Sequence, residues 1–489
     1  MPALPDPQGH ADLRAATARA DHGNALFRLG EWEQAAARYR EALALAPSVA
    51  ETHFSLANAL ARLGDAPAAI AALREALAHD PGHAGARTNL GNMLRAAGQP
   101  EAALDEYRRA LYLRPQDPAA RYNLGTALAD LDRLEEALVW FAQAAEAGHV
   151  PALTAMGTAH LQLGEPMVAL HWFRAAHRSG DRSGASKLGE GLSLLTLGDL
   201  RAGWEGYEAR PVTQAFQAAG ATPRWDGSQE VRGRTVLVWA EQGLGDSIQF
   251  ARYLPLLRGR GARVVLAAQA PLHALLAPLA DEMVATGASL SPDLHCPLPS
   301  LPRAFATSLA TIPARVPYLH APPARPAHRE QPPGATLHVG LAWAGNPDFA
   351  RDRHRSLPLA AIATLLALPG IAWHVLQKDL RDGDAAALAA LPGVQVPGPG
   401  FTDFADTASC VAGLDLVISA DTSVAHLAGA LGRPCWIMLP HAADFRWLRD
   451  RDDSPWYPTA RLFRQARRGD WAGVVANVAA ALAAFTAPA

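Results

Sequence analysis

A short apolar run near the end of the chain leads into polar residues that could bind an anion. Residues 414–420 have the nearly continuous apolar character of a strand buried on both faces, and residues 424–431 predict a helix that Gly432 ends. The start of such a helix offers backbone N–H groups and the positive end of its dipole. An ordinary capped helix with a partly exposed histidine gives the same pattern. The candidate ligand-binding residues at this helix start are Asp421, Thr422, Ser423, Val424 and His426.

A second loop with chemical potential follows the predicted strand 235–240. It contains Gly243, Gly245 and Asp246, and the two glycines allow a ligand to approach the backbone closely. The loop is not a P-loop, because no lysine follows it, and it lacks the third glycine of a dinucleotide fingerprint. Asp246 could cap the next helix or face a cleft as a general base, and both interpretations stay open.

Basic residues follow two further strands. The run 351–355 comes after the predicted strand 337–342, and Lys378 ends the strand 371–376. Arginine binds phosphate oxygens in a bidentate fashion, so the run could neutralise a diphosphate. A solvated basic loop is the alternative. The acidic pair Asp382 and Asp384 lies away from any strand end, which favours a solvated loop, and we expect no metal site.

The elements that must position these residues alternate between strands and helices in two halves. This alternation predicts two facing doubly wound α/β lobes with a cleft between them. A proline-rich stretch separates the halves. The predicted regions are a repeat array at 1–214, a linker at 215–233, an N-terminal lobe on the acceptor side at 234–322, a hinge at 323–335 and a C-terminal lobe on the donor side at 336–489.

The first two hundred residues repeat with a period of 34. Prolines keep that period, and small residues mark the first helix of each unit. This is the tetratricopeptide pattern, so we predict about six units in an all-helical solenoid, the sixth being a cap or an adapter. The marker residues are Ala35, Ala69, Ala103, Ala137, Ala169 and Gly203, with Pro47, Pro81 and Pro115.

Asparagines recur in the first helices of these units. An amide side chain can donate to and accept from a peptide bond, so such a row could hold an extended protein segment in the concave groove. Hydrogen bonds within each repeat are the alternative. The candidate groove residues are Asn24, Asn58, Asn89, Asn92 and Asn123.

Composition narrows the function classes. The net charge of −3 argues against a nucleic acid or an anionic membrane as main partner. The three cysteines are far apart and form no metal-binding spacing, which is typical of a reducing compartment. We see no signal-peptide pattern and no run of membrane-spanning length, and we therefore expect a cytoplasmic protein without membrane insertion.

Four stretches together resemble bacterial tetratricopeptide-repeat glycosyltransferases. Their catalytic halves are similar to the ADP-heptose lipopolysaccharide heptosyltransferases, and the layout is similar to O-linked N-acetylglucosamine transferases and repeat-fused flagellin glycosyltransferases. Two positions differ from the heptosyltransferase pattern, where Ser423 replaces glycine and Arg355 replaces lysine. The four stretches are 241–246, 343–347, 421–427 and 454–458.

The resemblance implies a two-lobed glycosyltransferase-B fold of two Rossmann-like lobes and inverting, metal-independent transfer from a nucleotide-sugar, with no cofactor. It places the base at Asp246, with Gly243 and Gly245 in the acceptor loop. Donor binding falls on Arg355 and on Asp421, Thr422, Ser423, Val424 and His426, and we expect Gly345, Asn346 and Lys378 at the same donor site. The expected function is transfer to a hydroxyl of a protein acceptor, with flagellin as one candidate. The alternatives are a non-catalytic repeat scaffold and a transferase acting on a polysaccharide or lipid-linked glycan.

Overall fold

The computed structural model describes residues 7–211, 222–288, 290–322, 337–349, 352–391 and 393–486. It divides into two compact units, one formed by Met1–Ala159 with His171–Arg182 and the other by His160–Leu170 with Ser183–Ala489. The predicted hinge at 323–335, residues 215–221 of the predicted linker and Arg351 lie outside the described residues. None of the described helices is long and apolar enough to cross a bilayer.

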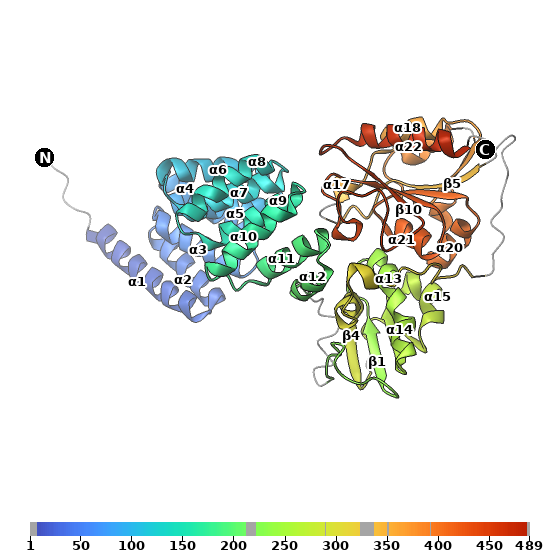
Figure 1. Cartoon of the computed structure of the whole chain (residues 1–489). Coiled ribbons are helices and arrows are strands. Elements are labelled where there is room, and N and C mark those ends of the chain that lie inside the picture. Colours follow the sequence, from blue (N-terminus) through green and yellow to red (C-terminus); the bar gives the residue numbers. More distant parts are fainter. Residues whose placement is uncertain are drawn as a thin grey trace. The chain divides into compact units, whose positions relative to one another are not determined.

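The N-terminal part consists entirely of helices that pack as consecutive pairs, which confirms the predicted all-helical solenoid (Figure 1). The helices are α1 (Pro7–Leu29), α2 (Trp32–Leu45), α3 (Ala50–Arg62), α4 (Ala66–His79), α5 (Ala84–Ala96), α6 (Pro100–Leu113), α7 (Pro118–Asp130), α8 (Leu134–Glu146), α9 (Val150–Gln162), α10 (Pro166–Arg178), α11 (Gly184–Thr196) and α12 (Leu200–Tyr207). The last pair, α11 and α12, lies in the second compact unit.

The period of 34 residues has a steric cause, which is a close approach between the two helices of a pair. A Cβ atom on Gly91 of α5 would lie 2.5 Å from Cε1 of Tyr107 on α6. Equivalent glycines face aromatic rings in three other pairs, with distances of 2.6–2.7 Å. In the second pair, Ala57 takes the place of the glycine and Leu73 the place of the aromatic residue. The methyl group of the alanine is therefore accompanied by a smaller side chain on the facing helix. The three other pairs are Gly23 with Tyr39, Gly125 with Phe141, and Gly157 with Phe173.

Part of the asparagine row is engaged within the repeats. The hydroxyls of Tyr39 and Tyr107 donate to Asn24 Oδ1 and Asn92 Oδ1, each at 2.8 Å. Asn89 instead donates from Nδ2 to Asn58 Oδ1 at 2.7 Å, which joins the first helices of neighbouring pairs. The side chains of Asn58, Asn89, Asn92 and Asn123 are half-buried, and their role in a groove stays a prediction.

The second unit contains two parallel sheets with flanking helices, which confirms the predicted α/β class. The smaller sheet has the order β3-β2-β1-β4 and the larger sheet β10-β9-β8-β5-β6-β7. The strands are β1 (Thr235–Trp239), β2 (Arg263–Ala268), β3 (Glu282–Ala285), β4 (Leu294–Pro297), β5 (Leu337–Ala342), β6 (Ile371–Val375), β7 (Val394–Gln395), β8 (Leu416–Ala420), β9 (Cys435–Leu439) and β10 (Ala460–Arg464).

Short helices connect these strands, and the larger sheet is covered on both faces, by α18 and α22 on one side and α20 and α21 on the other (Figure 1). The predicted helix after Asp246 is interrupted, since a 3₁₀ turn separates α13 from α14, which has Pro255 in its first turn. The helices are α13 (Leu244–Phe250), α14 (Leu254–Gly259), α15 (His273–Leu276), α16 (Leu301–Ala304), α17 (Asp352–Arg355), α18 (Leu359–Leu366), α19 (Asp384–Ala389), α20 (Phe404–Ala412), α21 (Ser423–Ala430) and α22 (Trp471–Thr486), with the short 3₁₀ helices η2 (Ala251–Tyr253), η3 (Ala270–Leu272), η4 (Ala277–Leu279), η5 (Leu298–Ser300), η6 (Leu309–Thr311), η7 (Gly398–Gly400) and η8 (Phe445–Trp447).

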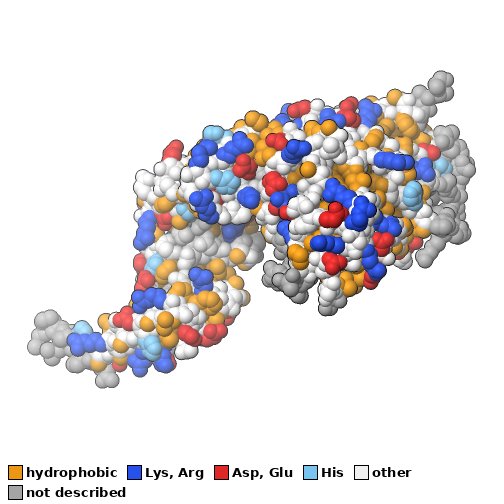
Figure 2. All heavy atoms as spheres, turned by 60° about the horizontal axis from the view of Figure 1, so that its bottom comes forward, with side chains coloured by type: hydrophobic (Ala, Val, Ile, Leu, Met, Phe, Trp, Pro, Cys, Tyr) orange, Lys and Arg blue, Asp and Glu red, His pale blue; other side chains and the backbone are white. Residues whose placement is uncertain are grey.

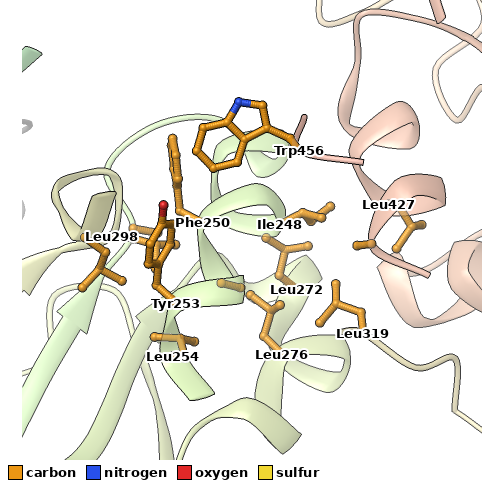
Figure 3. Packing of buried hydrophobic residues seen from close by; sticks show 14 of the residues in the cluster. Ile248, Phe250, Tyr253, Leu254, Leu272, Leu276, Leu298, Leu319, Leu427 and Trp456 are labelled. Carbon is orange, nitrogen blue, oxygen red and sulfur yellow. The ribbon is translucent and has the colours of Figure 1, made fainter. Parts of the chain in front are cut away.

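One hydrophobic core joins the two sheet regions. Ile248 and Phe250 of α13 lie in it beside Trp456, and Leu427 of α21 approaches from the other region (Figure 3). All four side chains are buried. Because α13 and α21 pack against each other, the loops that precede them are also held together.

Acidic and basic side chains alternate over the face of the molecule shown in Figure 2. This mixture agrees with 44 Lys and Arg residues against 47 Asp and Glu residues.

The glycine at the helix-pair contact should be replaceable only together with its aromatic partner. We expect Gly91→Ala to destabilise the array by about 1–3 kcal/mol, because the new methyl group overlaps the buried Tyr107 ring. In a Tyr107→Leu background, which copies the Ala57 and Leu73 pair, the same change should be neutral or stabilising, since alanine favours a helix by about 1 kcal/mol over glycine. Urea unfolding of the four proteins measures this, and equal costs in both backgrounds would contradict it.

Candidate active site

The two loops singled out by their sequence both follow strands at topological switch points. In the larger sheet the chain runs outward from β5 in one direction and from β8 in the other, and these two strands are neighbours. In the smaller sheet β1 and β4 are the corresponding pair. The carboxyl ends at such points form a crevice where α/β proteins bind ligands. Asp421 directly follows β8, and the loop to Asp246 follows β1.

Asp246 connects the two sheet regions. Its Oδ2 accepts from the Gly243 N–H at 2.9 Å, so the expected capping interaction is present. Its Oδ1 accepts from Nη2 of Arg446, which follows β9 on the larger sheet. The Asp246 side chain stays 21% exposed. Because a carboxylate accepts about four hydrogen bonds, these two contacts orient the group and leave acceptor positions for a further ligand.

Arg446 is almost completely buried, with 8% of its side chain exposed. Its Nη1 donates to Asp444 Oδ1 at 2.7 Å and its Nε to Gln249 Oε1 at 2.5 Å, and the guanidinium lies 4.4 Å from the centre of the Phe445 ring. Burial disfavours the charge, but Asp444 and Asp246 together raise the pKa of Arg446 well above its ordinary value. A permanent positive charge therefore lies beside the Asp246 carboxylate.

His426 lies one turn into α21 and against the loop that carries Asp246. A Cβ atom on Gly245 would come within 2.8 Å of the His426 ring, so glycine is required there by close approach. The His426 ring stacks on Trp447 with centroids 5.3 Å apart, and Nδ1 lies 2.9 Å from the Tyr457 hydroxyl oxygen. Burial and then the charge of Arg446 lower the pKa of His426 well below its ordinary value, so the ring is neutral at pH 7.

Asp421 and Thr422 form the start of α21. Thr422 is its N-cap, and its Oγ1 accepts from the Val424 N–H at 3.3 Å. Ser423 is the first helical residue and is half-buried. Burial, followed by the negative charge of Asp444, raises the pKa of Asp421 to about 6, and Arg355 opposes this shift. Arg355 is thus close enough to act electrostatically on Asp421.

Arg355 is held in place by a buried carboxylate. Asp352 is 2% exposed; it accepts from Arg355 Nε at 3.2 Å and from Arg381 Nη2 at 2.7 Å. A Cβ atom on Gly345 would lie 2.4 Å from Asp352 Oδ1 and 2.6 Å from Arg355 Nη2, so glycine lets the loop after β5 pass close to this ion pair. Asp352 therefore orients two guanidinium groups near the carboxyl end of β5.

Other predicted residues lie in different environments. Asn346 is exposed, and its Oδ1 accepts from the Asp348 N–H at 3.0 Å in a local turn. Lys378 is also exposed and donates from Nζ to the Phe401 carbonyl. Asp384 caps a local turn by accepting from the Arg381 N–H at 3.2 Å. Among the described residues, no group of three or more potential ligands could hold a metal ion.

Sequence reasoning missed the residues that organise this site. Arg446 stands in an aromatic run, which gave no sign that the residue contacts Asp246 200 positions earlier. Asp352 and Arg381 also received no role. The available signal was the position of Arg446 between two aromatic residues, Phe445 and Trp447. An arginine among large apolar side chains is rarely buried unless it is paired, so this pattern favours a buried ion pair over a solvated loop.

Comparisons with known proteins extend over most of the chain. Residues 20–84 and 54–118 match one tetratricopeptide repeat model and residues 88–186 another, so the helical array consists of tetratricopeptide repeats. The chain is also 30% identical over 367 residues to Protein FlbA of Caulobacter vibrioides, across 67% of this chain. The match spans only 60% of the length of FlbA.

Solved tetratricopeptide structures resemble part of the chain. A MamA protein is 23% identical with a TM-score of 0.32, and the likeness covers 34% of this chain and 91% of MamA. YrrB, described as a TPR protein with an unusual peptide-binding site, is 27% identical with a TM-score of 0.32, covering 35% of this chain and 89% of YrrB.

The raised pKa of Asp421 predicts that Asp421→Asn stabilises the protein more at pH 7.5 than at pH 5. Between the ordinary pKa of 3.8 and the folded value of about 6, the folded state keeps a proton that the unfolded chain loses. Wild-type stability from this group therefore falls as pH rises through that window, whereas asparagine does not titrate. Urea unfolding at both pH values measures the difference. Asp382→Asn, at an exposed position, is the control, and a pH-independent effect of Asp421→Asn would refute the prediction.

Proposed function

We propose that the chain is an inverting glycosyltransferase that moves a sugar from a nucleotide-sugar to a hydroxyl group of a protein acceptor. The observation that carries this proposal is a pair of contacts between the two sheet regions. Asp246 pairs with Arg446, and its neighbour Gly245 lies against His426. Both loops stand at switch points, where a ligand could contact both sheets. In this proposal the two α/β regions are the lobes of a glycosyltransferase-B fold.

The donor diphosphate fits the larger sheet. Arg355 acts on Asp421 at the start of α21, and the helix dipole adds positive charge at the same place. Asp352 fixes the Arg355 guanidinium in advance, so little reorganisation is needed when negative charge develops. These groups supply positive charge from the protein itself, in agreement with the metal-independent reaction that the sequence resemblance implies.

The acceptor side fits the loop after β1. In the proposed reaction the acceptor oxygen attacks the anomeric carbon, the bond from that carbon to the diphosphate oxygen breaks, and Asp246 takes the hydroxyl proton. Arg446 and the Gly243 N–H hold the Asp246 carboxylate in one orientation. Neutral His426 can donate or accept a single hydrogen bond without adding charge near the departing diphosphate.

The repeat array supports a protein acceptor, because tetratricopeptide solenoids offer a concave groove for a partner chain. Flagellin remains the candidate that the sequence resemblance suggests. A non-catalytic scaffold is the second candidate, favoured because the matched family models cover the repeats alone. The buried Asp421, whose ionisation is costly at neutral pH, is expected at a functional site and has no role in a scaffold.

Nucleotide binding is the first test of the proposed function. One member of the panel ADP, UDP, GDP, CDP and CMP should raise the thermal unfolding temperature, since a ligand at about 100 times its dissociation constant adds roughly 2.7 kcal/mol. Arg355→Ala should lose most of this shift. Arg353→Ala, an exposed position on the same short helix, is the matched control and should keep it. A wild-type protein that responds to none of the five would favour the scaffold.

The role of Asp246 is tested by Asp246→Asn, which keeps the shape of the side chain but removes its basicity. We expect transfer to fall by about 10²–10⁴-fold, the range for loss of a general base, while the nucleotide-induced thermal shift is retained. Transfer of radiolabelled sugar to the acceptor provides the rate. A variant that transfers sugar at the wild-type rate would show that another group takes the proton.

A further inference from the structure

The last helix of the repeat array, α12, and the residues just after it contact the loop 240–243. This loop leads into α13, the helix that carries Asp246. The Tyr207 hydroxyl donates to Gln242 Oε1 at 2.9 Å, and Nε of Arg210 donates to Glu241 Oε1. The Arg210 and Glu241 side chains are only 2% and 1% exposed. Both loop residues come just before Gly243, whose N–H donates to the Asp246 carboxylate.

The end of α12 is also fixed to the neighbouring strand. Arg210 donates from Nη2 to Ser300 Oγ at 2.6 Å and from Nη1 to Glu208 at 3.0 Å, and Arg224 binds the same Ser300 at 2.7 Å. Ser300 lies in η5, directly after β4. Since β1 and β4 form the switch point of the smaller sheet, this cluster holds both of its loops.

α12 also contacts the residue that precedes Arg446, the partner of Asp246. Trp204 is 1% exposed and makes edge-on contacts with Phe445 at 5.7 Å and with Phe250 at 6.0 Å between ring centroids. Phe445 immediately precedes Arg446, and Phe250 ends the helix that contains Asp246. One repeat helix therefore packs against Phe250, on the helix that carries Asp246, and against Phe445, the residue next to Arg446.

Stability alone does not require this arrangement. A buried ion pair such as Arg210 with Glu241 costs desolvation, and well-packed apolar residues of similar size are often as stabilising or more so. What directional hydrogen bonds add is a defined geometry. A small displacement of a reacting group can reduce a rate by up to a hundredfold, so a fixed loop matters for the proposed reaction.

We propose that α12 belongs to the transferase site, with Tyr207 and Arg210 as positioning residues for the loop 240–243, which leads into the helix that carries Asp246. The proposal rests on the proposed function and deepens it. The sixth repeat unit then works as part of the catalytic region, while the earlier units are left for binding the partner. This also explains why α11 and α12 belong to the second compact unit.

Tyr207→Phe is the decisive variant, because it removes one hydroxyl and keeps the ring contacts with Trp204 and Phe445. We expect kcat for transfer to fall about tenfold with KM for the donor unchanged. Tyr253→Phe is the matched control, since that buried hydroxyl lies 2.8 Å from Oγ1 of Thr307, a residue outside the loop 240–243. Equal kcat values for the two variants would overturn the proposal.

A second measurement does not depend on activity. Hydrogen exchange of backbone amides in residues 241–246 should be faster in Tyr207→Phe than in Tyr253→Phe or wild type. Gln242→Met removes the other partner of the same bond, so it should give the same effect, and the double variant should add nothing further. Unchanged exchange in both single variants would refute the positioning role.

The two measurements also separate this proposal from the proposed function. If wild type neither binds a nucleotide nor transfers sugar but the exchange prediction holds, the transferase assignment fails and α12 still fixes the loop. If wild type transfers sugar and the exchange and kcat values of Tyr207→Phe equal those of the control, only the positioning role fails.

Discussion

Burying the guanidinium of Arg446 is the constraint on which the arrangement of the second unit depends. An isolated charge in that position would be very costly, and the carboxylates of Asp246 and Asp444 offset much of this cost. Asp246 must therefore stay on the first turn of α13, which in turn must pack on α21. The glycine at 245 is needed for this contact, because any side chain would collide with His426.

Much of this architecture could be predicted from the sequence, because it depends on local patterns. The 34-residue period follows from helix pairs in close contact, and the start of α21 follows from an apolar strand ahead of a Thr422 cap. The Arg446 contact has no local signature, since its partner is distant in the chain. The place of Lys378 after a strand predicts a phosphate contact for it, whereas Arg381, which has no such signal, is the residue bound to Asp352. The repeat pattern also does not show that α11 and α12 belong to the second compact unit, because that grouping depends on their packing against residues distant in the chain.

The electrostatics of the site oppose stability in two places. Asp421 is buried near another carboxylate, and His426 is kept neutral by burial and nearby arginines. The two groups have opposite effects on the pH dependence of stability. The raised pKa of Asp421 makes the folded state less stable as pH rises, and the lowered pKa of His426 makes it less stable as pH falls. Such unfavourable environments are typical of residues retained for function. Here a neutral imidazole and a carboxylate whose ionisation is disfavoured lie beside fixed positive charges.

The position of Trp204 has a consequence for how the chain assembles during synthesis. Its ring is covered by Phe250, Phe445 and Trp456, two of which are made only when nearly the whole chain has left the ribosome. The earlier helix pairs can complete their own cores as they emerge, since their buried contacts are mostly between neighbours in sequence. The pair α11 and α12 instead keeps a large apolar surface uncovered until the last quarter of the protein arrives. The newborn chain therefore leaves Trp204 exposed at the end of a region whose earlier helix pairs can already be folded.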